Sequence, residues 1–425
     1  MTEILSSQCK NGTISKTSEV STARNNISGM LGEKNVSRRS LLKFGFGLSA
    51  NAVLSACGTS QQRPDIQKTP SAEIPPLPEY ESPEPNQKVL VIPLLAEGDM
   101  KPATRAQLIE HMKQISDFYR NSSGGEIDYS FTVLDWKPVH QSIDQKDLKK
   151  MLEGMATVGD DAARHAVHNI DQYKTRMYLM DVNIATLGGS GRAEKRVPDT
   201  YNRAWISNFA FTLRSPNLMK HELGHTLGLN HDDVVEFDSG ALPDNYQDNA
   251  HSLSAGGNSI MGSESGDFNI CQKIALGWVE REQVQTVTSQ NKAQDRTYTI
   301  SAMELNDPKS TLSLRIPFKQ YDPAMKKEKW QFYYVQYNKP VYSSTNPNSL
   351  DSGGLEFRIW DEGVGSNTQQ VYINHADPHN PNAPLQRTNE VTDGAYFYDK
   401  IHGIKIRQLR HSDTNVAVQV LFDKK

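Results

Sequence analysis

The sequence has little cysteine, no long hydrophobic run and almost no net charge, and each absence excludes a class of protein. Three cysteines in 425 residues are too few and too far apart for a disulfide framework or a cysteine-rich zinc site. A mean hydropathy of -0.62 excludes a bundle of transmembrane helices. A formal charge of -4, from 46 basic and 50 acidic side chains, lacks the basic bias of nucleic-acid binders. We therefore expect no nucleic-acid partner, and a chain long enough for two domains with separate cores.

The N-terminal part of the chain has the pattern of an export signal. Residues 1–36 are polar and lack apolar periodicity, which is typical of disorder. An arginine pair at 38–39 and a short apolar stretch at 44–53 resemble a twin-arginine signal. The run LSAC at 54–57 looks like a bacterial lipoprotein cleavage box. This resemblance implies export by the twin-arginine machinery, lipidation of Cys57, and anchoring to a bacterial membrane on its periplasmic face or at the cell surface.

A proline-rich segment, 58–87, follows this signal segment (1–57). It contains seven prolines among mostly polar residues. Such a composition favours extended, polyproline-like conformations and cannot form a core. We predict a disordered linker that holds a folded body away from the membrane surface.

Strand and helix patterns alternate over the first of the two predicted domains, 88–290. Strands are predicted at 88–95, 127–136 and 177–184, and helices at 103–121 and 144–172, the second with a break near Gly159. The order β-α-β-α-β predicts a mixed, twisted sheet with at least some parallel strands.

The C-terminal range, 291–425, has a different character. Seven short β-rich runs are separated by loops rich in Asn, Asp, Pro and Gly. They begin at residues 297, 311, 330, 354, 369, 403 and 416. This pattern predicts a β-sandwich-like domain, so the fold class of the whole chain is α+β.

One segment, HELGHTLGLNH starting at His221, carries a metal-binding pattern. Residues four apart share a helix face, so His221 and His225 can present their imidazoles to one metal ion. A Ser-Pro pair at 215–216 is a typical helix start, with serine as the cap and proline in the first turn. Gly228 can end the helix with a positive φ and bring His231 back as a third ligand. Three neutral imidazoles leave the fourth zinc position open, as in catalytic sites.

Glu222 follows the first of these histidines and faces the same cleft without needing to bind metal. Its carboxylate can take a proton from the water at the zinc ion and later pass it to the leaving amine. We therefore interpret Glu222 as the catalytic base and acid, and His221, His225 and His231 as ligands of one catalytic Zn²⁺.

This segment resembles the extended zinc motif of the metzincin peptidases, whose fold has a methionine-containing turn beneath the metal. NSIMG at 258–262 resembles that turn, with Met261 as the floor residue. Around these motifs the chain looks most similar to the gametolysin and immune-inhibitor-A-like peptidases, at 246–248 and at 269–278, which ends in Leu-Gly-Trp. Residues 190–210 depart from the family pattern, so substrate preference does not carry over.

Weaker patterns accompany these motifs. The acidic residues between His231 and the methionine turn could bind Ca²⁺ or form a solvated loop; they are Asp232, Asp233, Glu236, Asp238, Asp244 and Asp248. Cys271 has no partner cysteine nearby and is expected to be a buried thiol. The histidines outside the motif are expected to have surface or structural roles.

Together these patterns predict a zinc-dependent endopeptidase acting on extracellular or periplasmic proteins. Its peptide substrate would bind extended along a sheet edge and pair through main-chain hydrogen bonds. Two alternatives stay open. One is a surface-anchored binding lipoprotein with a structural zinc, and the other is a peptidase selective for glycoproteins such as mucins.

Overall fold

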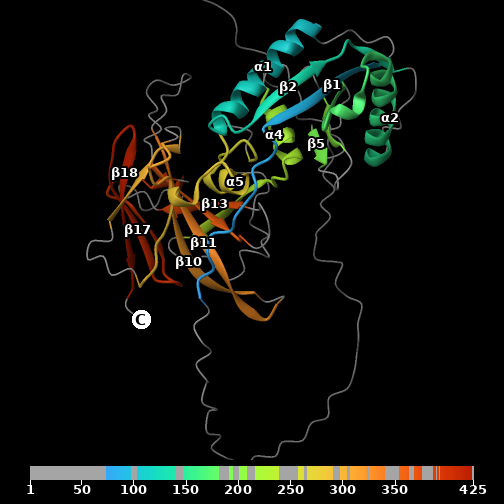
Figure 1. Cartoon of the computed structure of the whole chain (residues 1–425). Coiled ribbons are helices and arrows are strands. Elements are labelled where there is room, and N and C mark those ends of the chain that lie inside the picture. Colours follow the sequence, from blue (N-terminus) through green and yellow to red (C-terminus); the bar gives the residue numbers. More distant parts are fainter. Residues whose placement is uncertain are drawn as a thin grey trace, which may run out of the picture. The chain divides into compact units, whose positions relative to one another are not determined.

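The structure is a computed structural model of the chain (Figure 1). It describes residues 73–96, 103–139, 147–180, 191–194, 201–207, 216–238, 257–262, 266–290, 297–303, 307–322, 325–339, 354–362, 368–375, 386–388, 390–391 and 393–423. All of them belong to one compact unit, Ser71–Lys425. The predicted signal segment and Cys57 lie outside the described residues and stay predictions. Among the helices of the described part, none is long and apolar enough to cross a membrane.

The first sheet has the strand order β2-β1-β4-β6-β5, with β3 also beside β1. Its strands are β1 (Asn86–Ala96), β2 (Asp128–Val133), β3 (Lys137–Val139), β4 (Thr175–Met180), β5 (Gly191–Glu194) and β6 (Asn202–Ser207). The pairs β1–β2, β1–β4 and β4–β6 are parallel, whereas β5 runs antiparallel to β6. The prediction of a mixed sheet with parallel strands is confirmed.

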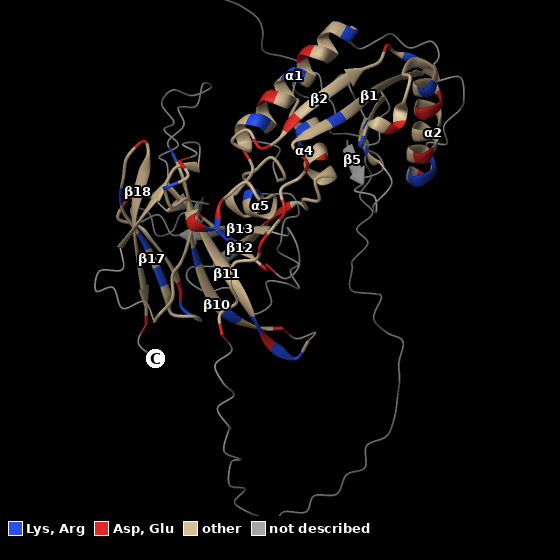
Figure 2. Cartoon of the chain, in the orientation of Figure 1, with Lys and Arg blue, Asp and Glu red and all other residues tan. Residues whose placement is uncertain are grey.

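Helices cover both faces of this sheet (Figure 1). Helix α1 (Arg105–Ser122) packs on the face that presents Val89, Val91 and Met177. Helix α2 (Leu148–Ala166) packs on the other face, which presents Leu90 and Ile92. Successive strand residues point to opposite faces, so a strand buried on both sides reads as a continuous apolar run. Basic and acidic residues are interspersed along both helices (Figure 2).

The predicted break near Gly159 is wrong, because α2 continues through this residue. A Cβ atom at position 159 would lie 2.8 Å from the ring of Tyr178 on β4. The glycine therefore serves close packing of the helix on the sheet, and that packing outweighs its low helix propensity.

Two further sheets form the C-terminal part. The second has the order β14-β13-β12-β11-β10-β8, with β15 beside β12 and β7 beside β13, and the third has the order β16-β17-β18-β9. The strands are β7 (Asp232–Asp238), β8 (Val284–Thr286), β9 (Thr297–Ser301), β10 (Ser313–Asp322), β11 (Lys327–Asn338), β12 (Gly354–Trp360), β13 (Thr368–His375), β14 (Gln386–Thr388), β15 (Glu390–Val391), β16 (Tyr396–Asp399), β17 (Ile404–His411) and β18 (Asn415–Phe422). Both sheets contribute to one apolar core, as packed sheets do. The molecule is thus α+β, and each predicted β-rich run overlaps a strand.

Strand β7 connects the two predicted domains. It follows the zinc motif in the sequence, yet it pairs in parallel with β13 over seven residues, from Asp232↔Thr368 to Asp238↔Asn374. The ranges 88–290 and 291–425 therefore share a sheet, and the boundary between them stays a prediction.

The predicted disordered linker needs a correction for residues 73–85. This segment is extended and packs against the body through Ile74, Leu77 and Tyr80. The Tyr80 ring stacks on Trp360 with the ring centroids 5.8 Å apart. The main chain of this segment is also hydrogen-bonded, since the Arg315 guanidinium donates to the Pro75 carbonyl at 2.9 Å. Residues 73–84 belong to no strand, so the amide hydrogen that proline lacks is not needed there for a sheet ladder. We call residues 73–85 the strap.

Candidate metal centre

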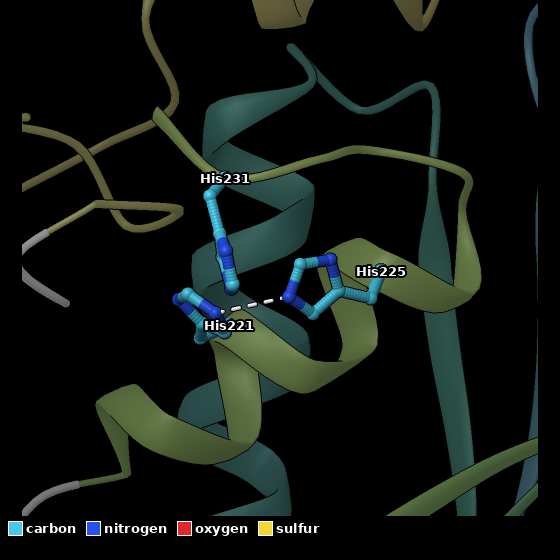
Figure 3. A group of neighbouring side chains, drawn as sticks. All are labelled: His221, His225 and His231. Carbon is cyan, nitrogen blue, oxygen red and sulfur yellow. Dashed lines mark hydrogen bonds between the residues drawn. The ribbon is translucent and has the colours of Figure 1, made fainter. Parts of the chain in front are cut away.

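The first two histidines lie on helix α4 (Asn217–Thr226). The helix begins one residue later than the sequence indicates, since Pro216 is the N-cap residue and makes no side-chain cap hydrogen bond. Ser215 lies outside the described residues. His221 and His225 project from one side of the helix, as their spacing predicts (Figure 3).

The helix ends in the turn that the glycine predicts. Gly228 has φ = 97°, a value that side-chain-bearing residues rarely adopt. Its N–H donates to the His225 carbonyl at 2.9 Å, and the N–H of Leu229 donates to the Gly224 carbonyl at 3.2 Å. These two bonds form a Schellman motif. The reversal brings His231, from beyond the helix end, to the other two imidazoles (Figure 3).

Two main-chain carbonyls set the orientation of the helical imidazoles. The Nδ1 of His221 lies 2.8 Å from the Ile260 carbonyl oxygen, and the Nδ1 of His225 lies 2.7 Å from that of Leu229. A carbonyl oxygen only accepts, so each Nδ1 carries a proton. The Nε2 of each neutral ring is then left with its lone pair directed toward the other imidazoles. This arrangement orients histidines for metal binding.

Three imidazoles are a donor set that suits a zinc ion. The ligand atoms of the three histidines all lie within 4.8 Å of one another, and the two helical Nε2 atoms are 3.1 Å apart (dashed line in Figure 3). Two nitrogens bound to one tetrahedral zinc would lie about 3.3 Å apart. Burial and the neighbouring histidines lower the pKa of His221 to about 4, and burial also lowers the pKa of His225. Both rings are therefore neutral near pH 7, as metal ligands must be.

Burial differs among the three histidines. His221 is buried, His225 is half-buried and His231 is exposed. One side of the cluster is thus shielded by the core and the other is open to solvent. A substrate could approach an ion held here from the His231 side.

Met261 packs against helix α4, and its predicted role as the floor residue of a metal site stays a prediction. Its side chain is fully buried in the same core as Leu223 and Phe268. A Cβ atom on Gly224 would lie 2.3 Å from the Met261 sulfur, which is far inside van der Waals contact. The glycine between the two helical histidines is therefore the residue that allows the methionine turn to pack directly on the helix.

Glu222 is on α4 between the two helical histidines and is only 4% exposed. A carboxylate in such a site interacts strongly with nearby charge, because little water screens it. Its charge also contributes, after burial and Tyr129, to raising the pKa of Tyr119 well above the usual range.

The other predicted residues have simpler roles. Asp232 is not available to calcium, because its carboxylate accepts two hydrogen bonds from Arg358. Asp244 and Asp248 lie outside the described residues, and a calcium site there stays a prediction. Cys271 is a free, buried thiol, as expected.

Two histidines far from the motif have structural partners, as predicted. His402 pairs with the buried carboxylate of Asp399 at 2.5 Å and with the Lys319 carbonyl. His411 pairs with Asp393 at 3.0 Å.

Several residues that shape the site were missed by sequence reasoning. The carbonyls of Ile260 and Leu229 belong to the main chain, so a pattern of side-chain types does not indicate them. Gly224 lies inside the motif, so a close approach could have been suspected there. Arg358 is 126 residues from its partner Asp232, and no local signal relates the two.

Comparisons with known proteins found only distant similarity. The sequence matches no protein-family model and no curated protein. Metalloproteinase-II from Bacteroides fragilis is 16% identical, with a TM-score of 0.26 over 37% of this chain and 47% of that chain, about half its length. Wild-type OgpA from Akkermansia muciniphila is 11% identical, with a TM-score of 0.29 over 76% of this chain and 96% of that one. The catalytically inactive form of OgpA, in complex with an O-glycopeptide (glycodrosocin), is also 11% identical. Its TM-score is 0.28 over 77% of this chain and 99% of that one. Similarity at this level does not establish a shared fold or activity.

Proposed function

We propose that this protein is a zinc-dependent endopeptidase of the metzincin type. The observation that carries the proposal is the convergence of His221, His225 and His231 within 4.8 Å. Two of these rings are oriented by main-chain carbonyls so that their Nε2 atoms face the others. A merely solvated histidine cluster has no need of such orientation.

The residues around the histidines supply the remaining chemistry. A zinc ion bound by the three imidazoles would polarise a peptide carbonyl and acidify a water molecule. Glu222 lies one residue after the first ligand and is almost completely buried. Its carboxylate accepts the proton of the attacking water and returns it to the leaving amine nitrogen. The exposed side of the cluster, at His231, admits the peptide.

Strand β5 offers a place for the substrate main chain. It is at the end of the strand order of the first sheet and pairs antiparallel with β6 on one side. It also lies against α4, the helix that carries two of the histidines. An extended peptide can add to such a sheet edge through main-chain hydrogen bonds. The proposed scissile bond would then run past the metal centre.

The proposal extends to where the protein acts. The twin-arginine pattern and the LSAC run ending at Cys57 favour an exported lipoprotein, anchored to a bacterial membrane at the periplasmic face or the cell surface. Its substrates would then be extracellular or periplasmic proteins or peptides, including glycoproteins.

The deciding experiment is cleavage profiling of the purified zinc-loaded chain on a mixed peptide and protein library. The control is Glu222→Gln, which keeps the shape of the side chain and removes its basicity. We expect zinc-dependent cuts from the wild type and at least a roughly 100-fold loss in the variant, with zinc still bound. Parallel reactions on glycosylated and deglycosylated substrates test selectivity for glycoproteins. If a folded, zinc-loaded wild type cuts neither, the binding-lipoprotein alternative replaces the proposal.

A further inference from the structure

A fully buried ion pair begins one residue after the third histidine of the cluster. Asp232 follows the third histidine, His231, in the sequence. The Arg358 guanidinium of β12 donates from one nitrogen to both of its carboxylate oxygens, at 3.1 and 2.9 Å. Both side chains are 0% exposed. Charges so far from water persist only when they are paired and well hydrogen-bonded.

The main chain of Asp232 is also hydrogen-bonded to the segment 257–262, which consists of Gly257 and the methionine turn (258–262). Its N–H donates to the Met261 carbonyl at 2.9 Å, and its own carbonyl accepts the Gly257 N–H at 2.9 Å. A Cβ atom on Gly257 would lie 2.3 Å from an Asp232 carboxylate oxygen. The turn therefore packs directly on the ion pair. The same turn supplies the Ile260 carbonyl that orients His221.

The other side of the guanidinium is fixed by the second sheet. Its remaining terminal nitrogen donates to Glu356 at 3.0 Å. Glu356 in turn accepts from the side-chain amides of Gln336 and Gln370, at 3.1 and 3.0 Å. All of these side chains are buried. The Arg358 fork is thus held in one orientation by strands β11, β12 and β13.

We propose that Arg358 is a positioning residue of the metal centre. By holding the Asp232 carboxylate, it fixes the chain at His231 and, through the methionine turn, the carbonyl that orients His221. The second sheet is then part of the metal centre's scaffold, although it contributes none of the three histidines. This inference rests on the proposed function in one respect, namely that the three histidines bind zinc.

The test measures the zinc dissociation constant of the full chain by competition with a chelating dye. Arg358→Lys keeps the charge and loses the planar fork that binds two carboxylates at once. We expect about 10- to 100-fold weaker zinc binding, as when other outer partners of metal ligands are changed.

The matched control is Arg315→Lys. Arg315 is another buried arginine of the second sheet, and it donates from two nitrogens to Glu362, at 2.6 Å each. Its further hydrogen bonds go to the Thr286 hydroxyl and the Pro75 carbonyl, outside the methionine turn. We expect this variant to lower the melting temperature and leave the zinc dissociation constant unchanged.

A double variant, Asp232→Asn with Arg358→Gln, removes the pair without leaving an unpaired carboxylate at position 232. A folded Arg358→Lys or double variant that binds zinc as tightly as the wild type overturns the proposal. It is also overturned if neither variant folds while Arg315→Lys does, since the pair then has a general structural role. Failure of the wild type itself to bind zinc would instead refute the proposed function.

Discussion

The contact between Gly224 and Met261 predicts that Gly224→Ala changes the free energy of unfolding in opposite directions with and without the Met261 side chain. Gly224→Ala places a methyl group 2.3 Å from the Met261 sulfur and 3.4 Å from the ring of Phe268. Overpacking of a buried site costs about 1–3 kcal/mol. Alanine regains about 1 kcal/mol over glycine inside a helix. The difference is a net destabilisation of up to about 2 kcal/mol. We expect the upper part of that range, about 1–2 kcal/mol, because the buried methionine has little room to move.

The same substitution should stabilise the protein once the methionine is removed. Met261→Ala alone leaves a cavity and costs about 2–5 kcal/mol. In that background the methyl group introduced at position 224 meets no sulfur and partly fills the cavity, and the helix gain of about 1 kcal/mol remains. The double variant should therefore be more stable than Met261→Ala by about 1 kcal/mol or more. The coupling energy of the cycle would be about 2–3 kcal/mol.

Urea unfolding of the four metal-free proteins measures this cycle, with equal m-values as the check for two-state behaviour. Metal-free samples separate packing from zinc binding. If Gly224→Ala destabilises both backgrounds equally, the glycine is not needed for the approach of Met261. The inference that Gly224 allows the methionine turn to pack directly on α4 would then be wrong.

Three further predictions follow from other parts of the chain. Gly277→Ala should destabilise the protein by about 1–3 kcal/mol. Gly277 has φ = 67°, and a Cβ atom there would lie 2.8 Å from the Ser82 hydroxyl of the strap. Thermal unfolding should show a smaller cost of the substitution in a chain that lacks residues 1–85. Cys57→Ala should abolish incorporation of a labelled fatty acid and shift the protein from the detergent phase to the aqueous phase on partitioning; equal partitioning would contradict the lipid anchor. Asp399→Asn should make the free energy of unfolding less dependent on pH in the acidic range. Although burial opposes ionisation of Asp399, its pairing with His402 holds the pKa below the usual value. Its stabilising contribution is therefore present above about pH 4 and is lost as the pH falls through the lowered pKa, which acid titration by circular dichroism would show.

The parts of the site that depend on local sequence were predictable. The histidine spacing and Gly228 both act within one helix and its end, where geometry follows directly from residue type. The structure places His221, His225 and His231 together as that geometry requires. The strands were predictable for a similar reason, since each apolar run is buried in the sheet it forms.

Long-range packing was not predictable from the same patterns. Gly159 suggests a helix break until Tyr178 is seen against it. The strap has the composition of a disordered linker, yet Tyr80 and its neighbours pack against an apolar cluster formed by residues from 270 to 360. In each case the deciding partner is far away in the sequence or belongs to another element, so a local pattern carries no information about it.

The short histidine motif describes the candidate metal centre incompletely, because residues outside the motif orient its side chains. The motif supplies three imidazoles and the glutamate. The orientation of His221, however, comes from the Ile260 carbonyl, and the turn that carries this carbonyl is bonded to Asp232. Asp232 is held in turn by Arg358 of the second sheet, 126 residues away, so the contacts around the three histidines join segments that are distant in the sequence. We therefore expect substitutions in the β-rich part to change the arrangement of the three histidines without replacing any of them.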